Sequence, residues 1–297
     1  MNAEYLTPVV TLFDQKGGID KDSCRRLYDR LIESGLDGLV ILGSAGEFFG
    51  MSMTQRRELT RFALGEIAGR TKVLIGTGCM NIDDTVTLSN EALDLGADGV
   101  MIVGPYYINL SAESIIQYYD QVAERVRGPI YLYNYPERTG YDLTPEITLT
   151  LLRRHRHIVG YKDTVSSMVH TRDLINAVRP DYPEFRIYAG YDENFAHTVL
   201  SGGNGCIGAL SNLVPEICSD WVQGFQTKDL VKVAANQQKI NRLMPFYAIC
   251  TPFMPAMKAA LNLRGFAFHL NCTYPIKSPT GEQIAAVREL LVIEDLI

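Results

Sequence analysis

Short apolar runs rich in β-branched residues recur along most of the chain, and segments with the apolar spacing of amphipathic helices separate them. Strands that alternate with helices at intervals of roughly 30 residues are typical of parallel βα units. The eight predicted strands are Tyr5–Thr11, Gly38–Leu42, Lys72–Thr77, Gly99–Val103, Pro129–Asn134, Ile158–Lys162, Phe185–Ala189 and Gly205–Leu210.

Local signals mark where helices begin and end between these strands. Ser52 followed by Gln55 is a capping box, and Thr144 precedes Pro145, a residue favoured at the first helical position. Three similar turns end a helix and open an apolar strand, with glycine suited to the helix end and Asp or Asn to the turn. These turns are Gly35–Gly38, Gly96–Gly99 and Gly202–Gly205.

Eight such units predict an α/β protein with a (β/α)8 barrel. The competing fold, a doubly wound sheet, usually has fewer strands and a glycine fingerprint after the first one, which this sequence lacks. From about Gln226 only helices are expected, over Thr227–Met244, Pro252–Leu263 and Pro279–Leu291. We therefore expect a barrel core in residues 1–225 and, in residues 226–297, C-terminal helices that pack on it within one structural unit.

The overall charge limits the classes of partner. The chain of 297 residues has a formal net charge of −6, which argues against nucleic acid or an anionic membrane as its main partner. Its basic residues form only short runs such as Arg153–Arg156, which we expect at a solvated helix end. No apolar run reaches the roughly 18 residues of a membrane span, and no signal peptide is expected.

The six cysteines contain no Cys-x-x-Cys pair and lie mostly among apolar residues. This pattern favours reduced thiols in the core of a cytoplasmic protein. The histidines show no metal-ligand spacing, since His155 and His157 are two residues apart and would face apart on a helix. No metal site is therefore predicted.

Lys162 is the strongest candidate for chemistry, because active sites of such barrels lie where strands end and the following loops begin. Strand alternation puts it on the same face as Ile158 and Gly160, and the glycine is expected to leave space beneath the lysine stem. Inside a barrel the charged ammonium is poorly solvated, which favours an amine that can attack a carbonyl. The alternative is a lysine that leans out of the barrel and pairs with an aspartate.

Tyr133 is the second candidate. It shares one face of the neighbouring predicted strand with Tyr131 and Tyr135. A phenol close to an amine can carry the protons that imine formation requires. The alternative is aromatic packing inside the barrel, and the residues alone leave both interpretations open.

The segment Gly43–Glu47 leads from an apolar strand into a loop of small residues. It lacks the fingerprints of a phosphate loop and of a dinucleotide site. Its backbone N–H groups and the Ser44 hydroxyl could bind a carboxylate, or the loop could merely reverse the chain.

Three further groups follow predicted strands. Asp192 and Glu193 could accept hydrogen bonds from substrate hydroxyls, or Asp192 could cap the next helix. Pro105–Tyr107 brings two aromatic rings to the end of a strand. Arg138 is the arginine near the expected barrel mouth that could bind a substrate carboxylate.

Four of these segments together resemble the dihydrodipicolinate synthase and N-acetylneuraminate lyase family, in order and over essentially the whole chain. Gly43–Glu47 is similar to its G-[ST]-[ST]-G-E loop, and Gly160–Thr164 to its G-x-K-[DE]-[ST] segment. Pro105–Tyr107 resembles its aromatic pair, and Tyr133–Pro136 its Y-N-x-P segment. Each segment lies at the end of a predicted strand.

The resemblance implies a class I lyase that forms a Schiff base with a 2-oxo acid and needs no metal or other cofactor. Lys162 would condense with the C2 carbonyl of pyruvate or a pyruvate-derived substrate, and Tyr133 would move protons during the reaction. The substrate carboxylate would lie on the hydroxyl and amides of Ser44 and Ala45, next to Gly46.

The resemblance also assigns residues that the pattern alone does not. Ile207 and Gly190 would line the pyruvate pocket through their backbone. Tyr107 would come from a neighbouring subunit, because members of this family are usually tetramers built as pairs of tight dimers.

The sequence then divides the family. Asp192 and Glu193 resemble the lyase and sugar-acid aldolase branch, where carboxylates bind hydroxyls, whereas Arg138 resembles the synthase branch, where an arginine binds the carboxylate of aspartate semialdehyde. Ala45 departs from synthases and neuraminate lyases, which commonly carry a second hydroxyl there. In synthases this hydroxyl relays protons between two tyrosines, so a synthase here would need a water or Ser44 instead. We give the lost hydroxyl more weight than the retained arginine.

We therefore predict reversible aldol cleavage of a 2-keto-3-deoxy sugar acid to pyruvate and an aldehyde. The alternatives are, in order, dihydrodipicolinate synthase, N-acetylneuraminate lyase and a barrel without catalysis that binds a metabolite. Arg138 also leaves open a substrate with a second carboxylate, including a dehydratase acting on a keto-deoxy aldarate. The expected partners are a small 2-oxo acid and other copies of the chain, in a homotetramer.

Overall fold

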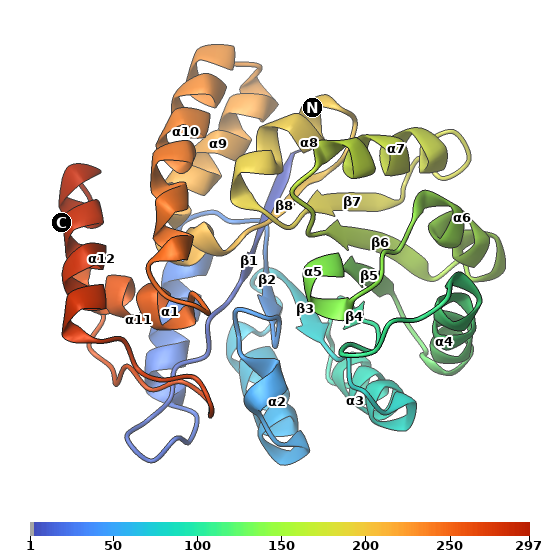
Figure 1. Ribbon diagram of the computed structural model, residues 1–297, viewed down its shortest axis with the longest axis horizontal. Helices are drawn as coiled ribbons and strands as arrows, with labels where there is room; N and C mark the ends of the chain where they lie inside the picture. Colours follow the sequence, from blue (N-terminus) through green and yellow to red (C-terminus); the bar gives the residue numbers. More distant parts are fainter. Residues whose placement is uncertain (1–2) are drawn as a thin grey trace. The chain divides into compact units, whose positions relative to one another are not determined.

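A computed structural model describes residues 3–297 of the chain (Figure 1). Its eight strands form a closed barrel in chain order, which confirms the predicted (β/α)8 class. The strands are β1 (Glu4–Pro8), β2 (Gly38–Ile41), β3 (Lys72–Gly76), β4 (Gly99–Val103), β5 (Ile130–Asn134), β6 (Ile158–Asp163), β7 (Arg186–Ala189) and β8 (Gly205–Ile207).

Helices follow the strands as the alternating pattern predicts. They are α1 (Lys21–Glu33), α2 (Met53–Ile67), α3 (Ile82–Asp94), α4 (Ala112–Arg125), α5 (Pro136–Thr139), α6 (Pro145–Arg154), α7 (Met168–Val178), α8 (Phe195–Leu200), α9 (Pro215–Thr227), α10 (Leu230–Leu243), α11 (Met254–Leu263) and α12 (Gly281–Ile293). Short 3-10 turns are η1 (Phe48–Gly50), η2 (Asp192–Asn194), η3 (Ala209–Asn212) and η4 (Met244–Ala248). Among residues 3–297, no helix is long and apolar enough to cross a membrane.

The predicted helix starts are confirmed. Ser52 caps α2, where its side chain accepts from the amide of Gln55 and the Gln55 side chain accepts in return from the amide of Ser52. Thr144 accepts from the amide of Ile147 at the start of α6, with proline at the first helical position. These capping bonds satisfy amides that a helix leaves without partners at its N-terminus.

The chain divides into two compact units, which we describe separately. The first holds residues 3–4 and Lys72–Gly208, and the second holds Tyr5–Thr71 and Ala209–Ile297. The C-terminal helices α10, α11 and α12 therefore belong to the same unit as α1 and α2. The expected end of the barrel core near residue 225 stays a prediction.

In the first unit, parallel ladders join the strands from β3 to β8 in chain order, with helices along their outer side (Figure 1). A cluster of charged residues connects the first residues of β1, β3 and β7. Glu4 accepts from Tyr188 Oη at 2.6 Å and from Lys72 Nζ at 2.9 Å, and it forms an ion pair with Arg186. Burial opposes the charge of Glu4, but these partners outweigh it and lower the pKa of the carboxyl.

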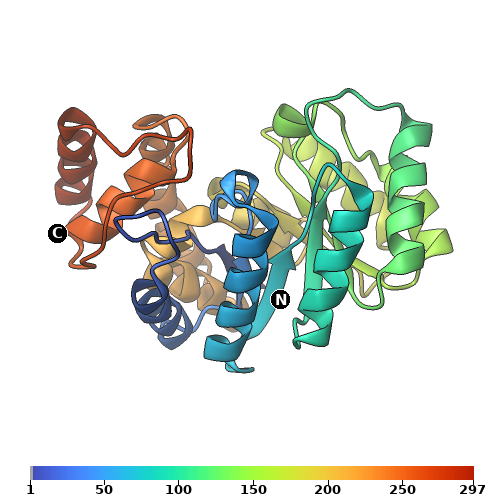
Figure 2. The same ribbon diagram turned by 90° about the horizontal axis from the view of Figure 1, so that it is seen from below.

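In the second unit, β1 pairs in parallel with β2, and α11 packs against α12 (Figure 2). Strand β8 was expected to extend to Leu210, but η3 begins at Ala209, and the fully buried side chain of Asn212 fixes this turn. Its Oδ1 accepts from the amide of Val10 at 3.1 Å, and its Nδ2 donates to the carbonyls of Pro8 and Ala209, both at 3.0 Å.

We predict that Asn212→Ala lowers the free energy of unfolding by about 2–4 kcal/mol, because it leaves one amide and two carbonyls in the core with a partner fewer. Urea denaturation followed by circular dichroism measures this loss. Asn109→Ala, at an exposed position, is the control and should change little. A loss below about 0.5 kcal/mol for Asn212→Ala would show that the turn does not depend on this side chain.

Candidate functional site

Lys162 lies on the inner face of β6, and only 4% of the residue is exposed. The ladder places its Cα opposite Tyr133 of β5 on one side and Tyr188 of β7 on the other. Its Nζ lies 4.5 Å from the centre of the Tyr133 ring. Among residues 3–297 no carboxylate forms an ion pair with it, so the alternative of a lysine that leans out to an aspartate is wrong.

Tyr133 is also buried, with 4% of the residue exposed. Its ring stacks on that of Tyr135 at 6.1 Å, and the Tyr135 ring meets Tyr191 edge to face at 6.4 Å. A row of aromatic rings thus extends from the lysine toward the segment after β7. This packing keeps the Tyr133 ring beside the amine, as the pairing of the two strands predicts.

The space expected beneath the lysine is filled. A Cβ on Gly160 would come within 2.2 Å of the Tyr131 ring, so the glycine makes room for that ring and leaves no hollow under the lysine stem. The Tyr131 ring in turn lies 6.5 Å from that of Tyr188. The rings of Tyr131 and Tyr188 therefore pack beneath the Lys162 side chain and leave its stem little conformational freedom.

Asp163, the neighbour of Lys162, points the opposite way and is 1% exposed. Its carboxylate accepts from Thr171 Oγ1 at 2.6 Å, from His170 Nδ1 at 2.8 Å and from Asn134 Nδ2 at 3.1 Å. Asn134 also donates to Asp142 at 2.7 Å and accepts from the amide of Leu143 at 3.0 Å. The asparagine of the Y-N-x-P segment thus fixes the outer side of the lysine strand.

His170 on α7 lies between two carboxylates. Its Nε2 is 3.3 Å from an oxygen of Asp142, and its Nδ1 meets Asp163. Burial disfavours the imidazolium, but Asp142 and Asp163 outweigh that effect and raise the pKa of His170 to about 10. The histidine is therefore positively charged at neutral pH. No motif in the sequence marks His170, because its contact with Asp163 joins a helix to the strand before it.

The segment after β7 contacts the end of β6. The amide of Gly190 donates to the carbonyl of Asp163 at 2.7 Å. A Cβ on Gly190 would lie 1.9 Å from Thr164 Oγ1, so only glycine fits there. Thr164 is 4% exposed and its Oγ1 has no hydrogen-bond partner among the described residues, which makes it a candidate binding group that the sequence analysis missed. Ile207 of β8 is fully buried.

Asp192 and Glu193 form the first part of η2. Asp192 is 1% exposed and is the first residue of η2, while Tyr191 and Asn194 occupy the N-cap positions of η2 and α8, so the alternative that Asp192 caps the next helix is wrong. Glu193 is half-buried, and burial together with the nearby Asp192 raises the pKa of its carboxyl. Two carboxyl groups with little access to water suit hydrogen bonding to hydroxyl groups.

Tyr107 and Arg138 are both exposed. Tyr107 has a left-handed backbone with φ of 79° and is 93% exposed. Arg138 on α5 is exposed, and its guanidinium lies 5.4 Å from the centre of the Tyr135 ring. A left-handed backbone is unusual for an exposed bulky residue such as this tyrosine.

In the second unit, Gly43–Glu47 forms a tight loop after β2. It is bracketed by two left-handed residues other than glycine, Leu42 with φ of 60° and Glu47 with φ of 61°. The amide of Gly46 donates to the carbonyl of Gly43 at 3.0 Å, and that of Glu47 to the carbonyl of Ser44 at 3.1 Å. These two hydrogen bonds fix the backbone of the loop on both sides of Ala45.

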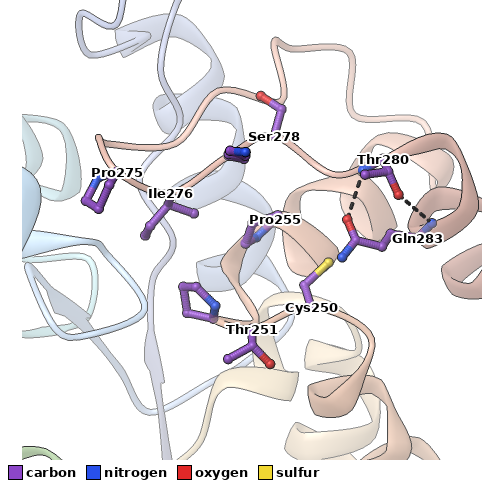
Figure 3. Close-up of a pocket in the computed structure, with 10 residues that line it drawn as sticks. Cys250, Thr251, Pro255, Pro275, Ile276, Ser278, Thr280 and Gln283 are labelled. Atoms are coloured by element: carbon purple, nitrogen blue, oxygen red, sulfur yellow. Dashed lines mark hydrogen bonds between the residues drawn. The ribbon is translucent and has the colours of Figure 1, made fainter.

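A cavity of about 430 Å³ lies between C-terminal segments of the second unit, and none of the predicted site residues lines it (Figure 3). In the same unit the hydroxyl of Thr280 and the amide of Gln283 form the cap of α12. Among residues 3–297, no group of three or more His, Cys, Asp or Glu side chains could hold a metal ion. The structure brings predicted catalytic groups together around Lys162, where the Tyr133 ring lies beside the amine.

Comparison with known proteins identifies the relatives. The Dihydrodipicolinate synthetase family matches residues 1–293. YagE of Escherichia coli, named provisionally as a 2-dehydro-3-deoxy-D-gluconate aldolase, is 38% identical over 88% of this chain and 86% of its own. A crystal structure of YagE in complex with pyruvate superposes with a TM-score of 0.97 and covers 99% of both chains.

Two further relatives match nearly the whole chain. YjhH of Escherichia coli, named provisionally as a 2-dehydro-3-deoxy-D-pentonate aldolase, is 36% identical over 98% of this chain and 97% of its own. A 4-hydroxy-tetrahydrodipicolinate synthase of Kosmotoga olearia is also 36% identical, over 95% and 94%. The family that the sequence resembles is thereby confirmed, whereas percent identity alone does not separate aldolases from synthases.

We predict that His170→Gln lowers the free energy of unfolding by about 2 kcal/mol at pH 6, since hydrogen bonds to charged groups are lost. The pKa of His170 is raised from 6.5 to about 10 on folding, so its stabilisation is complete below pH 6.5 and is lost as the pH rises through about 10. Urea titrations from pH 6 to pH 10 measure the difference from the unsubstituted chain. His197→Gln, on the exposed side of α8, is the control. A difference independent of pH would contradict the assigned charge.

Proposed function

The chain belongs to the Dihydrodipicolinate synthetase family, and on this basis we propose that it cleaves a 2-keto-3-deoxy sugar acid reversibly to pyruvate and an aldehyde. The observation that carries the proposal is the buried amine of Lys162, 4.5 Å from the Tyr133 ring and without a carboxylate partner among residues 3–297. A lysine in this setting is a nucleophile for a carbonyl carbon.

The reaction follows from the chemistry of an imine. The uncharged amine of Lys162 adds to the C2 carbonyl, and loss of water gives an iminium ion. The C3–C4 bond then breaks as the C4 hydroxyl loses its proton, and the electron pair moves into the iminium to leave an enamine. Protonation at C3 and hydrolysis release pyruvate and the lysine. Tyr133 moves the protons of these steps, because its phenol belongs to the ring that contacts Nζ.

We propose that the substrate carboxylate binds the hydroxyl and amides of Ser44 and Ala45, next to Gly46. The small size of the half-buried Ser44 and the buried Ala45 and Gly46 supports this role, because small residues allow a ligand close to the backbone. Gly190 and Ile207 line the pyruvate pocket through their backbone. Thr164 adds a buried hydroxyl two residues from Lys162.

The aldolase interpretation is favoured over the synthase by two features. Asp192 and Glu193 offer carboxyl groups to the hydroxyls of a sugar acid, and the methyl of Ala45 cannot relay protons between tyrosines. The names of YagE and YjhH support the same choice. The second candidate, a synthase, is favoured by Arg138 and by the relative from Kosmotoga olearia. N-acetylneuraminate lyase and a barrel without catalysis stand behind both.

We further propose that Tyr107 enters the site of a neighbouring copy in a homotetramer. Its 93% exposure and left-handed backbone support a role outside its own chain, since such a conformation is costly without a function. The reaction uses no metal or other cofactor, because the lysine imine is itself the electron sink. The free thiols of all six cysteines support a cytoplasmic location.

Reduction with sodium borohydride in the presence of pyruvate is expected to join a pyruvate-derived group to Lys162, because the imine becomes a stable secondary amine. Mass spectrometry of the peptides locates the modification. Lys162→Ala should abolish it, and Lys72→Ala, which removes the lysine paired with Glu4 at the strand starts, should retain it. Modification that persists in Lys162→Ala would overturn the proposed mechanism.

A substrate panel separates the candidate functions. We expect pyruvate release from five- or six-carbon 2-keto-3-deoxy acids, and a rate lower by at least about 100-fold with aspartate semialdehyde and pyruvate in the synthase direction, since a missing relay removes general acid–base catalysis. A coupled assay with lactate dehydrogenase measures pyruvate release, and an absorbance assay measures the synthase reaction. Faster synthase turnover would reverse the order of the two candidates, and release from the nine-carbon acid alone would favour neuraminate lyase.

A further inference from the structure

The last residue of the loop Gly43–Glu47 carries a charge that is completely buried. Glu47 and Lys258 of α11 both have no exposed surface, and Lys258 Nζ lies 2.5 Å from Glu47 Oε1. Lys258 interrupts an otherwise apolar run in α11, Met254–Leu261. Neither residue has a part in the proposed chemistry.

The polar atoms of this pair have further partners. Lys258 Nζ also donates to the carbonyl of Asn271 at 2.7 Å and lies 4.5 Å from the centre of the Phe13 ring. Glu47 Oε2 accepts from the amide of Thr273 at 2.6 Å and from its hydroxyl at 3.0 Å. Each carboxylate oxygen is thus held by a different segment of the C-terminal region.

The same contacts fix the backbone of the loop. The amide of Glu47 donates to the carbonyl of Ser44, and the left-handed backbone of Glu47 turns its side chain toward Lys258. Thr11 Oγ1 donates to the carbonyl of Gly46 at 2.8 Å. A Cβ on Gly50 would lie 2.2 Å from Thr273 Oγ1, so Thr273 packs directly against the chain that leaves the loop. After Thr273, the C-terminal segment continues through Pro275 and Ile276, which line the cavity of Figure 3.

Removing two charges from water is costly, and apolar side chains of the same size often stabilise a protein as well as a buried ion pair does. Core stability alone therefore does not account for this pair. A charge pair with directed hydrogen bonds has one geometry, and here that geometry sets the position of the residue three after Ser44. It also makes the loop conformation depend on the segment 271–273.

We propose that Glu47, held by Lys258 and Thr273, is a positioning residue that keeps the Ser44 and Ala45 amides in the arrangement that binds the substrate carboxylate. This inference rests on the proposed function, because it assigns the carboxylate to this loop. Lys258 and the C-terminal segment 271–273 thereby determine how strongly the protein prefers 2-oxo acids over ketones that lack a carboxylate.

Two carbonyl probes test this role. Pyruvate and hydroxyacetone both form an imine with a lysine, but only pyruvate has a carboxylate. Trapping with sodium cyanoborohydride gives a rate constant for each probe, and their ratio measures recognition of the carboxylate. The variants are Glu47→Gln, Lys258→Met and the double variant, which removes both charges with little change in shape and therefore keeps a folded test protein. Leu291→Ala, in α12, is a destabilised control outside the cluster. Ser44→Ala tests the carboxylate site itself.

We expect the ratio of pyruvate to hydroxyacetone trapping to fall by about 10- to 100-fold in the three cluster variants, because small displacements of binding groups have effects of this size. The rate constant with hydroxyacetone and the ratio in Leu291→Ala should stay unchanged. This result supports the positioning role.

The other outcomes overturn it in distinguishable ways. If Ser44→Ala lowers the ratio and the double variant does not, the loop binds the carboxylate but Glu47 does not position it. If Ser44→Ala leaves the ratio unchanged as well, the Ser44 hydroxyl does not bind the carboxylate and the positioning role of Glu47 fails. Equal losses with both probes, matched by Leu291→Ala, would assign the cluster to stability alone. If the unsubstituted protein traps neither probe, the proposed function itself fails.

Discussion

The alternation of side chains along β6 is the constraint on which the candidate site depends. Because successive residues point to opposite sides of a strand, an inward Lys162 requires an outward Asp163. The inward amine meets the Tyr133 ring, and the outward carboxylate meets His170, Thr171 and Asn134. A shift of one residue would exchange the two and bury the carboxylate where the amine is needed. The polar network outside the strand therefore fixes the register inside it.

The loop after β2 repeats this arrangement with different residues. Its small residues suit a ligand, and its last residue, Glu47, is held from behind by Lys258 and Thr273. In both places a buried carboxylate with two or more partners lies close in the chain to the group proposed to contact substrate. Asp163 directly follows Lys162, and Glu47 is three residues after Ser44. Such support holds a binding group in place without occupying the space that the substrate needs.

Much of this could be predicted from periodicity and turn chemistry, and the rest depended on contacts distant in sequence. The strands were placed to within a few residues, and Lys162 and Tyr133 follow from strand ends and alternation. The end of β8 was missed because Asn212 bonds to Pro8 and Val10, about 200 residues earlier, and no local signal announces such a contact. His170 was missed although Asp163 is only seven residues away, because their contact depends on how α7 packs against β6. Thr164 was missed because the sequence does not show that its hydroxyl is buried. Lys258 did leave a trace, a lone lysine in an apolar helix, which predicts a buried partner. The filled space at Gly160 shows that a glycine in a strand can admit a neighbouring ring rather than a ligand.

Family membership and the geometry around Lys162 lead to one central claim, that this lysine forms an imine with pyruvate. Carbon NMR of the protein with pyruvate labelled at C2 tests it without chemical trapping. The account predicts a protein-bound resonance at the position of an imine or enamine carbon, and its absence in a folded Lys162→Met variant. Spectra that contain only free pyruvate and its hydrate, at protein concentrations comparable to the ligand, would contradict the account.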